Sequence, residues 1–132
     1  MLLPKPLYRI GPVFTGLVLL LTGLSIAAAT KAQYKADGKA LFERRCGGCH
    51  ALDRDKEGPR LGEVYGRMSG SVDSFQYSDA LKKANVRWGD ETLDRWLTDP
   101  EKLVPNNDMT FHVESADERS AIIAFLKANS AK

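Results

Sequence analysis

The stretch Cys46-Gly47-Gly48-Cys49-His50 decides how this chain of 132 residues folds. Its spacing, Cys-x-x-Cys-His, is the signature by which a haem is attached covalently to a polypeptide. Two thiols three positions apart can each add to one haem vinyl group, and the adjacent histidine then lies under the iron as an axial ligand. The two glycines let the backbone lie close to the porphyrin. The motif therefore predicts one covalently attached haem c per chain.

Neighbouring cysteines also occur in a local disulfide, in half of a zinc site or in a thioredoxin-like redox pair. A zinc site needs two further ligands, and His112 is the one obvious candidate. A thioredoxin-like pair requires a βαβ pattern, which the sequence lacks. With two Cys in the chain, a multi-disulfide scaffold and an all-cysteine zinc site are both excluded.

The first 32 residues differ in composition from the rest. Lys5 and Arg9 precede the apolar run 13–24, which is followed by Ser-Ile-Ala-Ala-Ala. A basic start, a short apolar run and small residues at the end are typical of a secretory signal peptide. We therefore predict a signal peptide over 1–32 and a periplasmic domain over 33–132. The alternative is an uncleaved N-terminal anchor, because an apolar segment of about 17 residues is at the lower limit of a membrane span.

The composition, 43% hydrophobic and 27% charged, is that of one ordinary globular domain. It excludes a multidomain enzyme, a long disordered chain and a coiled coil. The whole chain has a formal charge of +2, but residues 1–32 carry three of the 19 basic residues and no acidic ones. Residues 33–132 thus hold 16 basic and 17 acidic residues, a net charge of −1. No basic surplus indicates a nucleic-acid partner.

Hydrophobic periodicity predicts a helical domain with long loops. The expected helices cover 34–46, 78–85 after a cap at Ser78, 91–99 after a cap at Asp90, and a last helix that opens at the Ser115-x-x-Glu118 capping box. No alternating strand pattern is present. The loops 47–74 and 100–114 are long for a compact domain unless they are functional, so we expect something other than side chains to fill its centre.

A haem iron bound by His50 has a second axial position. The candidates are Met68, Met109 and His112, and pairing of methionine with histidine raises the potential in electron carriers. We interpret Met68 as a core residue that fills space, and His112 as an exposed residue of a loop.

From residue 34 to 128 the chain resembles a small class I cytochrome c, the group that contains mitochondrial cytochrome c and its bacterial relatives. The matching stretches are Gly38-x-x-Leu41-Phe42, Cys46-Gly-Gly-Cys-His50, Gly58-Pro59-Arg-Leu61, Tyr65-Gly66-Arg67, Phe75-x-Tyr77-Ser78-x-Ala80-Leu81, Trp88, Leu93-x-x-Trp96-Leu97-x-x-Pro100, Pro105-x-x-x-Met109-x-Phe111 and Ile122-Ile-Ala-Phe125-Leu126. The resemblance implies an all-α cytochrome c fold, with three main helices and long loops wrapped around one covalently attached haem.

The resemblance also implies roles for single residues. Cys46 and Cys49 are the thioether anchors, and His50 is the proximal ligand, its ring N–H bonded to the carbonyl of Pro59. Met109 is the distal ligand. The residues expected to hold the buried haem propionates are Arg67, Tyr77, Trp88 and Asn107. Gly38 and Phe42 are expected to meet Ile122 and Phe125 where the first and last helices cross.

Several residues depart from the pattern of the group. Asn106-Asn107-Asp108 replaces the common Gly-Thr-Lys, so an acid stands where relatives present a lysine to their partners. Trp96 stands where relatives often have a tyrosine that bonds the methionine sulfur. We expect its indole near the haem, and whether its N–H takes over that bond is open. Leu81 replaces a buried polar residue, and His112 replaces a small one. A positive patch near the haem edge, or an ordinary solvated face, is expected from Lys82, Lys83 and Lys102.

The sequence thus favours an exported monohaem electron carrier and not an enzyme. It is expected to be a monomer that docks transiently with soluble or membrane redox proteins of a respiratory or related chain, as electron donor and acceptor. The main alternative is a haem enzyme or gas-responsive protein, such as a peroxidase-like site with a detachable Met109. Another is a tethered domain that serves one oxidase, which requires the uncleaved anchor.

Overall fold

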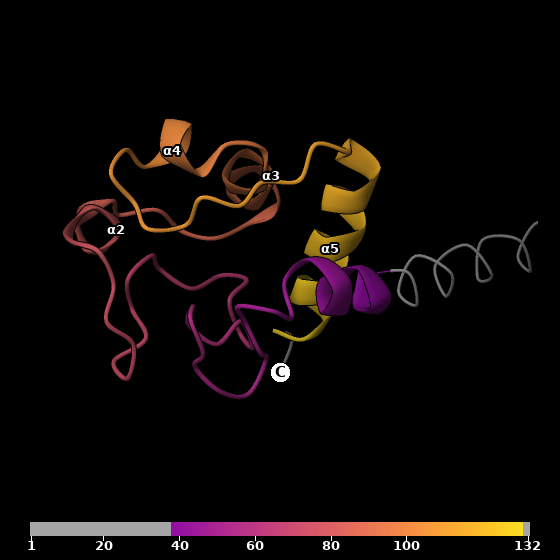
Figure 1. Cartoon of the computed structure of the whole chain (residues 1–132), viewed down its shortest axis with the longest axis horizontal. Coiled ribbons are helices and arrows are strands. Elements are labelled where there is room, and N and C mark those ends of the chain that lie inside the picture. The colour runs from indigo at the N-terminus through magenta and orange to yellow at the C-terminus, as the bar shows by residue number, and fades with distance from the viewer. Residues whose placement is uncertain (1–37, 131–132) are drawn as a thin grey trace, which may run out of the picture. The chain divides into compact units, whose positions relative to one another are not determined.

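A computed structural model describes residues 38–130 (Figure 1). A first helical segment covers residues 38–45, and the helices that follow are α2 (Asp79–Lys83), α3 (Asp90–Thr98), α4 (Pro100–Leu103) and α5 (Ala116–Ala128). Within 38–130 there is no strand, only a single antiparallel bridge between Met68 and Arg87. The all-α prediction is confirmed. The expected signal peptide or anchor, 1–32, lies outside the described residues.

The first helical segment packs against α5, as expected from the sequence (Figure 1). A Cβ atom built on Gly38 would overlap the carbonyl oxygen of Ala121 and lie 2.9 Å from Cβ of Phe125. The rings of Phe42 and Phe125 lie 5.3 Å apart, and Ile122 is fully buried. Gly38 therefore allows two helix backbones to approach more closely than any other residue would.

The helix starts follow local hydrogen bonding, and one predicted cap is wrong. Ser78 and Ser115 cap α2 and α5, their hydroxyls accepting from the N–H groups of Leu81 and Glu118. Helix α3, however, is capped by Gly89, whose N–H donates to the Thr92 hydroxyl at 2.8 Å. Asp90 is instead the first residue of α3, where its negative charge interacts favourably with the positive N-terminal end of the helix dipole.

The second long loop contains a helix that the sequence reasoning missed. Pro100 does end α3, but it also opens the four-residue α4, because a proline at the first helical position loses no hydrogen bond. The Asp99 carboxylate accepts from the Lys102 N–H at 3.0 Å and caps this turn. The remainder, 104–115, is a loop, and its Val113 N–H donates to Leu97 O at 2.7 Å, which ties it to the end of α3.

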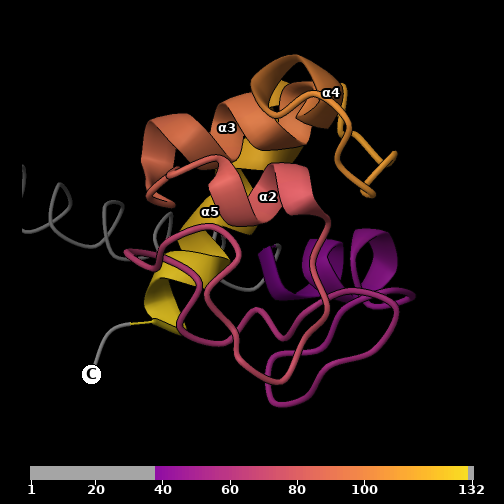
Figure 2. The same ribbon diagram turned by 90° about the vertical axis from the view of Figure 1, so that its left-hand side faces the viewer.

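Buried side chains of the helices and loops form one core. Its largest contributors come from the first helical segment, α3 and α5, and Val64, Trp88, Val104 and Val113 join it from the connecting segments. In both views α2, α3 and α4 lie on one side of the domain and the loops of 46–77 on the other (Figure 2). Among the described helices, none is long and apolar enough to cross a membrane.

Candidate functional site

A cavity of about 530 Å³ lies between the helices and the loops. Its volume is in the range of sites for organic cofactors. All ten residues named as site candidates from the sequence line it, namely Cys46, Cys49, His50, Pro59, Arg67, Tyr77, Trp88, Trp96, Asn107 and Met109. Apolar side chains such as Leu61, Val64, Leu93 and Leu126 complete the walls. Segments distant in sequence therefore line one cavity. It lies in the centre of the domain, where the long loops led us to expect something other than side chains.

One wall holds His50 in a fixed orientation. Its Nδ1–H donates to the carbonyl oxygen of Pro59 at 2.7 Å, so Nε2 carries the lone pair and is the nitrogen available to bind a metal. Gly58 lies directly against the ring, since a Cβ atom there would overlap Cε1 and lie 2.7 Å from both nitrogens. Burial lowers the pKa of His50, although the Pro59 bond opposes the shift, so the imidazole is neutral at physiological pH.

The two cysteines follow the end of the first helical segment. The N–H groups of Cys49 and His50 both donate to Cys46 O, at 3.1 and 2.8 Å, and this turn sets the spacing of the motif. Both thiols are free, with Cys46 partly buried and Cys49 exposed. Burial, and secondarily the neighbouring Cys49, raises the pKa of the Cys46 thiol to about 11. The Cys46 side chain is therefore uncharged at neutral pH, as an apolar cavity requires.

A second wall presents the sulfur of Met109. The Trp96 indole Nε1–H donates to Met109 Sδ at 3.2 Å. The backbone N–H of Met109 donates to Asn107 Oδ1 at 2.7 Å, and the amide group of Asn107 donates to Val104 O at 2.9 Å and to Glu101 Oε2 at 3.4 Å. Asn107 lines the cavity, but its side chain holds the Met109 loop in place and does not offer its donors to a propionate.

The third group of cavity residues is polar and centred on Arg67. Its Nη1 and Nη2 donate to Gly62 O at 3.1 Å and to Arg60 O at 2.9 Å, while its buried Nε has no hydrogen-bond partner within 38–130. Burial lowers the pKa of Arg67 and raises that of Tyr77, each opposed by the attraction between the two groups. A buried cationic N–H without an acceptor is rare in native proteins. It fits an anionic group within the cavity.

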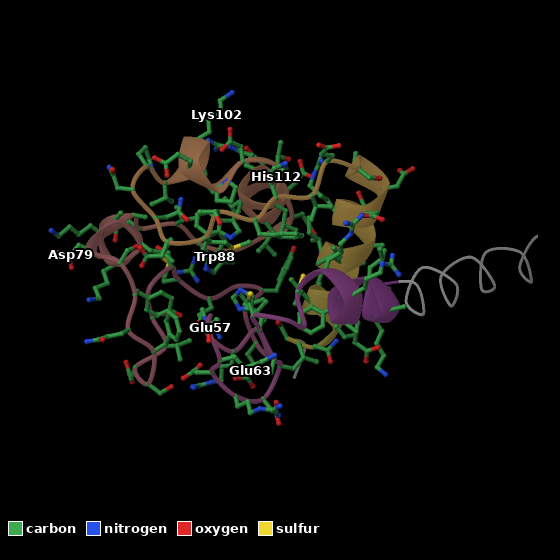
Figure 3. All side chains as sticks on the ribbon, viewed as in Figure 1. Glu57, Glu63, Asp79, Trp88, Lys102 and His112 are labelled. Atoms are coloured by element: carbon green, nitrogen blue, oxygen red, sulfur yellow. The ribbon has the colours of Figure 1, made fainter. Side chains whose placement is uncertain are left out.

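These observations test whether the cavity suits haem c. It offers two thiols, a neutral imidazole, a thioether sulfur, apolar walls and an unsatisfied cationic donor for a carboxylate. Trp88 (Figure 3), which is 7% exposed, closes the space beside Trp96, and the centroids of the two rings lie 5.3 Å apart. Residues of these types match the thioether anchors, axial ligands and propionates of a haem. The residues fit the group.

The other candidate ligands lie elsewhere. Met68 pairs with Arg87 through the backbone bridge and does not line the cavity. His112 is exposed on the loop before α5 (Figure 3). Within 38–130 no cluster of three or more His, Cys, Asp or Glu side chains is arranged to hold a metal ion.

The three lysines expected near the haem edge or on a solvated face are all exposed. Lys82, Lys83 and Lys102 do not line the cavity, and Lys102 points away from it on α4 (Figure 3). Lys82 lies 3.8 Å from Asp79 on its own helix. These positions suit the solvated face that the sequence also allowed, and a positive patch at the haem edge stays a prediction.

Asp55 was not recognised from the sequence. Its carboxylate accepts from the Arg60 N–H at 2.8 Å and from the Ser74 hydroxyl at 2.5 Å, and so joins the loop after the Cys-x-x-Cys-His motif to the loop before Tyr77. Both contacts lower the pKa of Asp55, the Ser74 bond most. An aspartate among charged loop residues carries no periodic signal that would have singled it out.

Comparisons with known proteins were consistent with this site. The family model described as "Cytochrome c" matches residues 35–130. A cytochrome c of Chlamydomonas reinhardtii is 38% identical over 112 residues, covering 82% of this chain and all of the relative. A cytochrome c of Euglena viridis is 43% identical over 93 residues, covering 68% and 91%. Cytochrome cH from Methylobacterium extorquens superposes with a TM-score of 0.67 at 36% identity, covering 70% of this chain and 96% of the other.

Proposed function

Because this chain belongs to the cytochrome c family of haem-bearing electron carriers, we propose that it is an exported one-electron carrier whose iron is bound by His50 and Met109. The observation that supports this best is the shared cavity, which brings the two side chains together from positions 59 residues apart. Each side chain is also held by a hydrogen bond. His50 donates to the carbonyl of Pro59, and the Met109 sulfur accepts from the indole of Trp96.

Haem c, when bound, supplies an iron that alternates between the ferrous and ferric states. His50 offers Nε2 as a neutral donor, because Pro59 holds the proton on Nδ1. Cys46 and Cys49 provide the sulfurs for the two thioether bonds. Arg67, with Tyr77 and Trp88, would hold the propionates and so compensate the cost of burying their charge.

The second wall keeps Met109 in place. Trp96 donates to the sulfur from the rigid helix α3, and Asn107 holds the backbone of the same residue through its amide oxygen. A thioether sulfur favours the reduced iron, and walls that exclude water disfavour the extra positive charge of the oxidised state. A methionine held at both its sulfur and its backbone would stay in place in either oxidation state, so electron transfer would need little atomic rearrangement. These features suit a carrier and not an enzyme that opens its iron to substrate.

The proposal includes the fate of the N-terminus and the partners. We propose that residues 1–32 direct export to the periplasm and are then removed, which leaves a monomer of residues 33–132. Its partners are redox proteins of a respiratory or related chain, bound transiently over a small interface so that turnover stays fast. Intact mass of the purified protein tests two points together: loss of the leader, and a gain of one covalently held haem over the apo-mass.

The optical spectrum tests the ligand assignment. Bound methionine gives the oxidised protein a weak far-red charge-transfer band, which we expect, together with slow and weak cyanide binding. Absence of the band, with tight cyanide or carbon monoxide binding at rest, would instead favour a peroxidase-like or gas-responsive protein. A mass that retains residues 1–32 would favour the tethered carrier.

A further inference from the structure

We infer that the partner of this carrier docks on an apolar centre at Phe111 and presents a positively charged surface around it. The inference rests on the proposed function, since it concerns where an electron leaves the cavity. We call the residues involved, which are all exposed, the Phe111 surface: Asp108, Thr110, Phe111, His112 and Glu114.

Phe111 marks the place of contact. Among residues 38–130 it is the one large hydrophobic side chain that is exposed, at 42%, and it also lines the cavity. It therefore lies at the rim, where the wall of the cavity meets solvent. An exposed aromatic ring beside a cofactor cavity suits a partner contact, because aromatic residues are enriched at the centres of interfaces.

The segment that carries this ring is acidic. Residues 103–118 hold four acidic side chains, Asp108, Glu114, Asp117 and Glu118, and no lysine or arginine. The rest of 33–132 then holds 16 basic and 13 acidic residues, so a domain of net charge −1 is divided into an acidic stretch and a basic remainder. Within 38–130, Asp108, Glu114 and Asp117 are exposed and form no ion pair.

Two arginines across the rim share one of these four carboxylates. Arg45 pairs with Glu118 at 2.8 Å, and Arg44 lies 3.9 Å from the same carboxylate. Apart from the half-buried Arg67, the other charged residues that line the cavity are Glu57 (Figure 3) and Asp108. Lys102, the nearest basic residue before 103–118 in the sequence, points away on α4. At Phe111 itself a partner meets the unpaired carboxylates of Asp108 and Glu114, and a positive surface would complement them.

Small redox reagents of opposite charge test this with the holoprotein. The reduced protein is mixed with a cationic cobalt(III) tris-phenanthroline complex or with anionic hexacyanoferrate(III). Each reaction moves one electron from the protein to the reagent, giving cobalt(II) or hexacyanoferrate(II) and the oxidised protein. At about pH 8, the rate with the cation should fall about tenfold as ionic strength rises from roughly 0.01 to 0.15 M. The rate with the anion should rise.

Two matched variants locate the effect. Asp108→Lys and Asp53→Lys change the net charge equally, but Asp53 is an exposed loop residue that does not line the cavity. Asp108→Lys should flatten or reverse both salt dependences, and Asp53→Lys should leave both nearly as they were. A second measurement does not depend on electron transfer: an octalysine peptide added to the holoprotein should shift NMR amide signals of 107–115 and not those of 51–57.

The outcomes separate this inference from the proposed function. Faster reaction with the anion at low salt, equal effects of the two variants, or peptide shifts outside 107–115 would each overturn the docking inference while the carrier function stands. If neither reagent oxidises the protein, the carrier function fails, and the docking inference fails with it.

Discussion

A single methyl group at Gly58 should disturb the proximal side of the site. Gly58→Ala places a Cβ atom over Cε1 of His50 and 2.7 Å from both ring nitrogens, closer than real Cβ atoms approach other heavy atoms. The ring has little freedom to move, because Nδ1–H is bonded to Pro59 O and the Gly58 N–H donates to Cys49 O at 2.8 Å. The substitution must therefore displace the imidazole, the loop or both.

The substitution destabilises the protein because the new Cβ atom and the hydrogen bond from His50 to Pro59 cannot both be accommodated. Inserting a methyl group into a packed site costs about 1–3 kcal/mol. Losing the bond from His50 to Pro59 adds about 0.5–1.5 kcal/mol. We expect Gly58→Ala to lower the free energy of unfolding of the holoprotein by roughly 2–4 kcal/mol. Displacing a group that orients a metal ligand should also change the redox potential.

Guanidinium unfolding followed by haem absorbance and circular dichroism measures this cost. Asp53→Ala is the control, since Asp53 is an exposed residue of the loop between the motif and Gly58 and does not line the cavity. The control should differ from the parent by less than about 0.5 kcal/mol. Equal stability and potential in Gly58→Ala and the parent would refute the reasoning that Gly58 clears space for a fixed imidazole.

Three further predictions concern single side chains. Met109→Ala should abolish the far-red band, lower the potential and open the iron to cyanide, whereas Met68→Ala should leave the visible spectrum unchanged; an unaltered potential in Met109→Ala would remove Met109 as ligand. Trp96→Phe should weaken retention of Met109 by about one hydrogen bond and tighten cyanide binding up to about tenfold in a titration; unchanged affinity would show that the indole does not hold the sulfur. Asp55 has a lowered pKa, so its carboxylate stabilises the fold at pH values above the ordinary pKa of aspartate. This contribution is lost as pH falls through the pKa of the folded state. Asp55→Asn should therefore be less stable than the parent at pH 7, with the difference shrinking below about pH 4 in urea titrations; a difference that does not depend on pH would contradict this assignment.

Local sequence signals accounted for most of the helical framework. Ser78 and Ser115 cap their helices because a hydroxyl and an N–H three residues later depend only on local geometry. The same reasoning failed at Asp90, where Gly89 is the cap. There the Asp90 carboxylate accepts from the Tyr65 hydroxyl at 2.6 Å and from Lys127 at 2.8 Å, two residues brought to it by the fold.

The site residues also include some that local sequence predicted and others whose role depends on the tertiary structure. Cys46, Cys49 and His50 are adjacent in sequence, so their spacing alone predicted a covalent haem. Which donor holds the Met109 sulfur was left open, and the tertiary structure places the Trp96 indole there. The amide donors of Asn107 go to Val104 and Glu101 and not into the cavity, a result that depends on the path of the backbone after α4.

By itself, the sequence determined the chemistry of attachment, the helical periodicity and the total charge, because each of these follows from residue types at fixed short spacing. Only the tertiary structure decided which carboxylates remain unpaired around Phe111 and which donor of the half-buried Arg67 is left without an acceptor. It also decided that Gly58 lies against the imidazole ring of His50, where no side chain would fit. These features depend on the direction of side chains from segments far apart in the chain, and that direction exists only after the segments have packed.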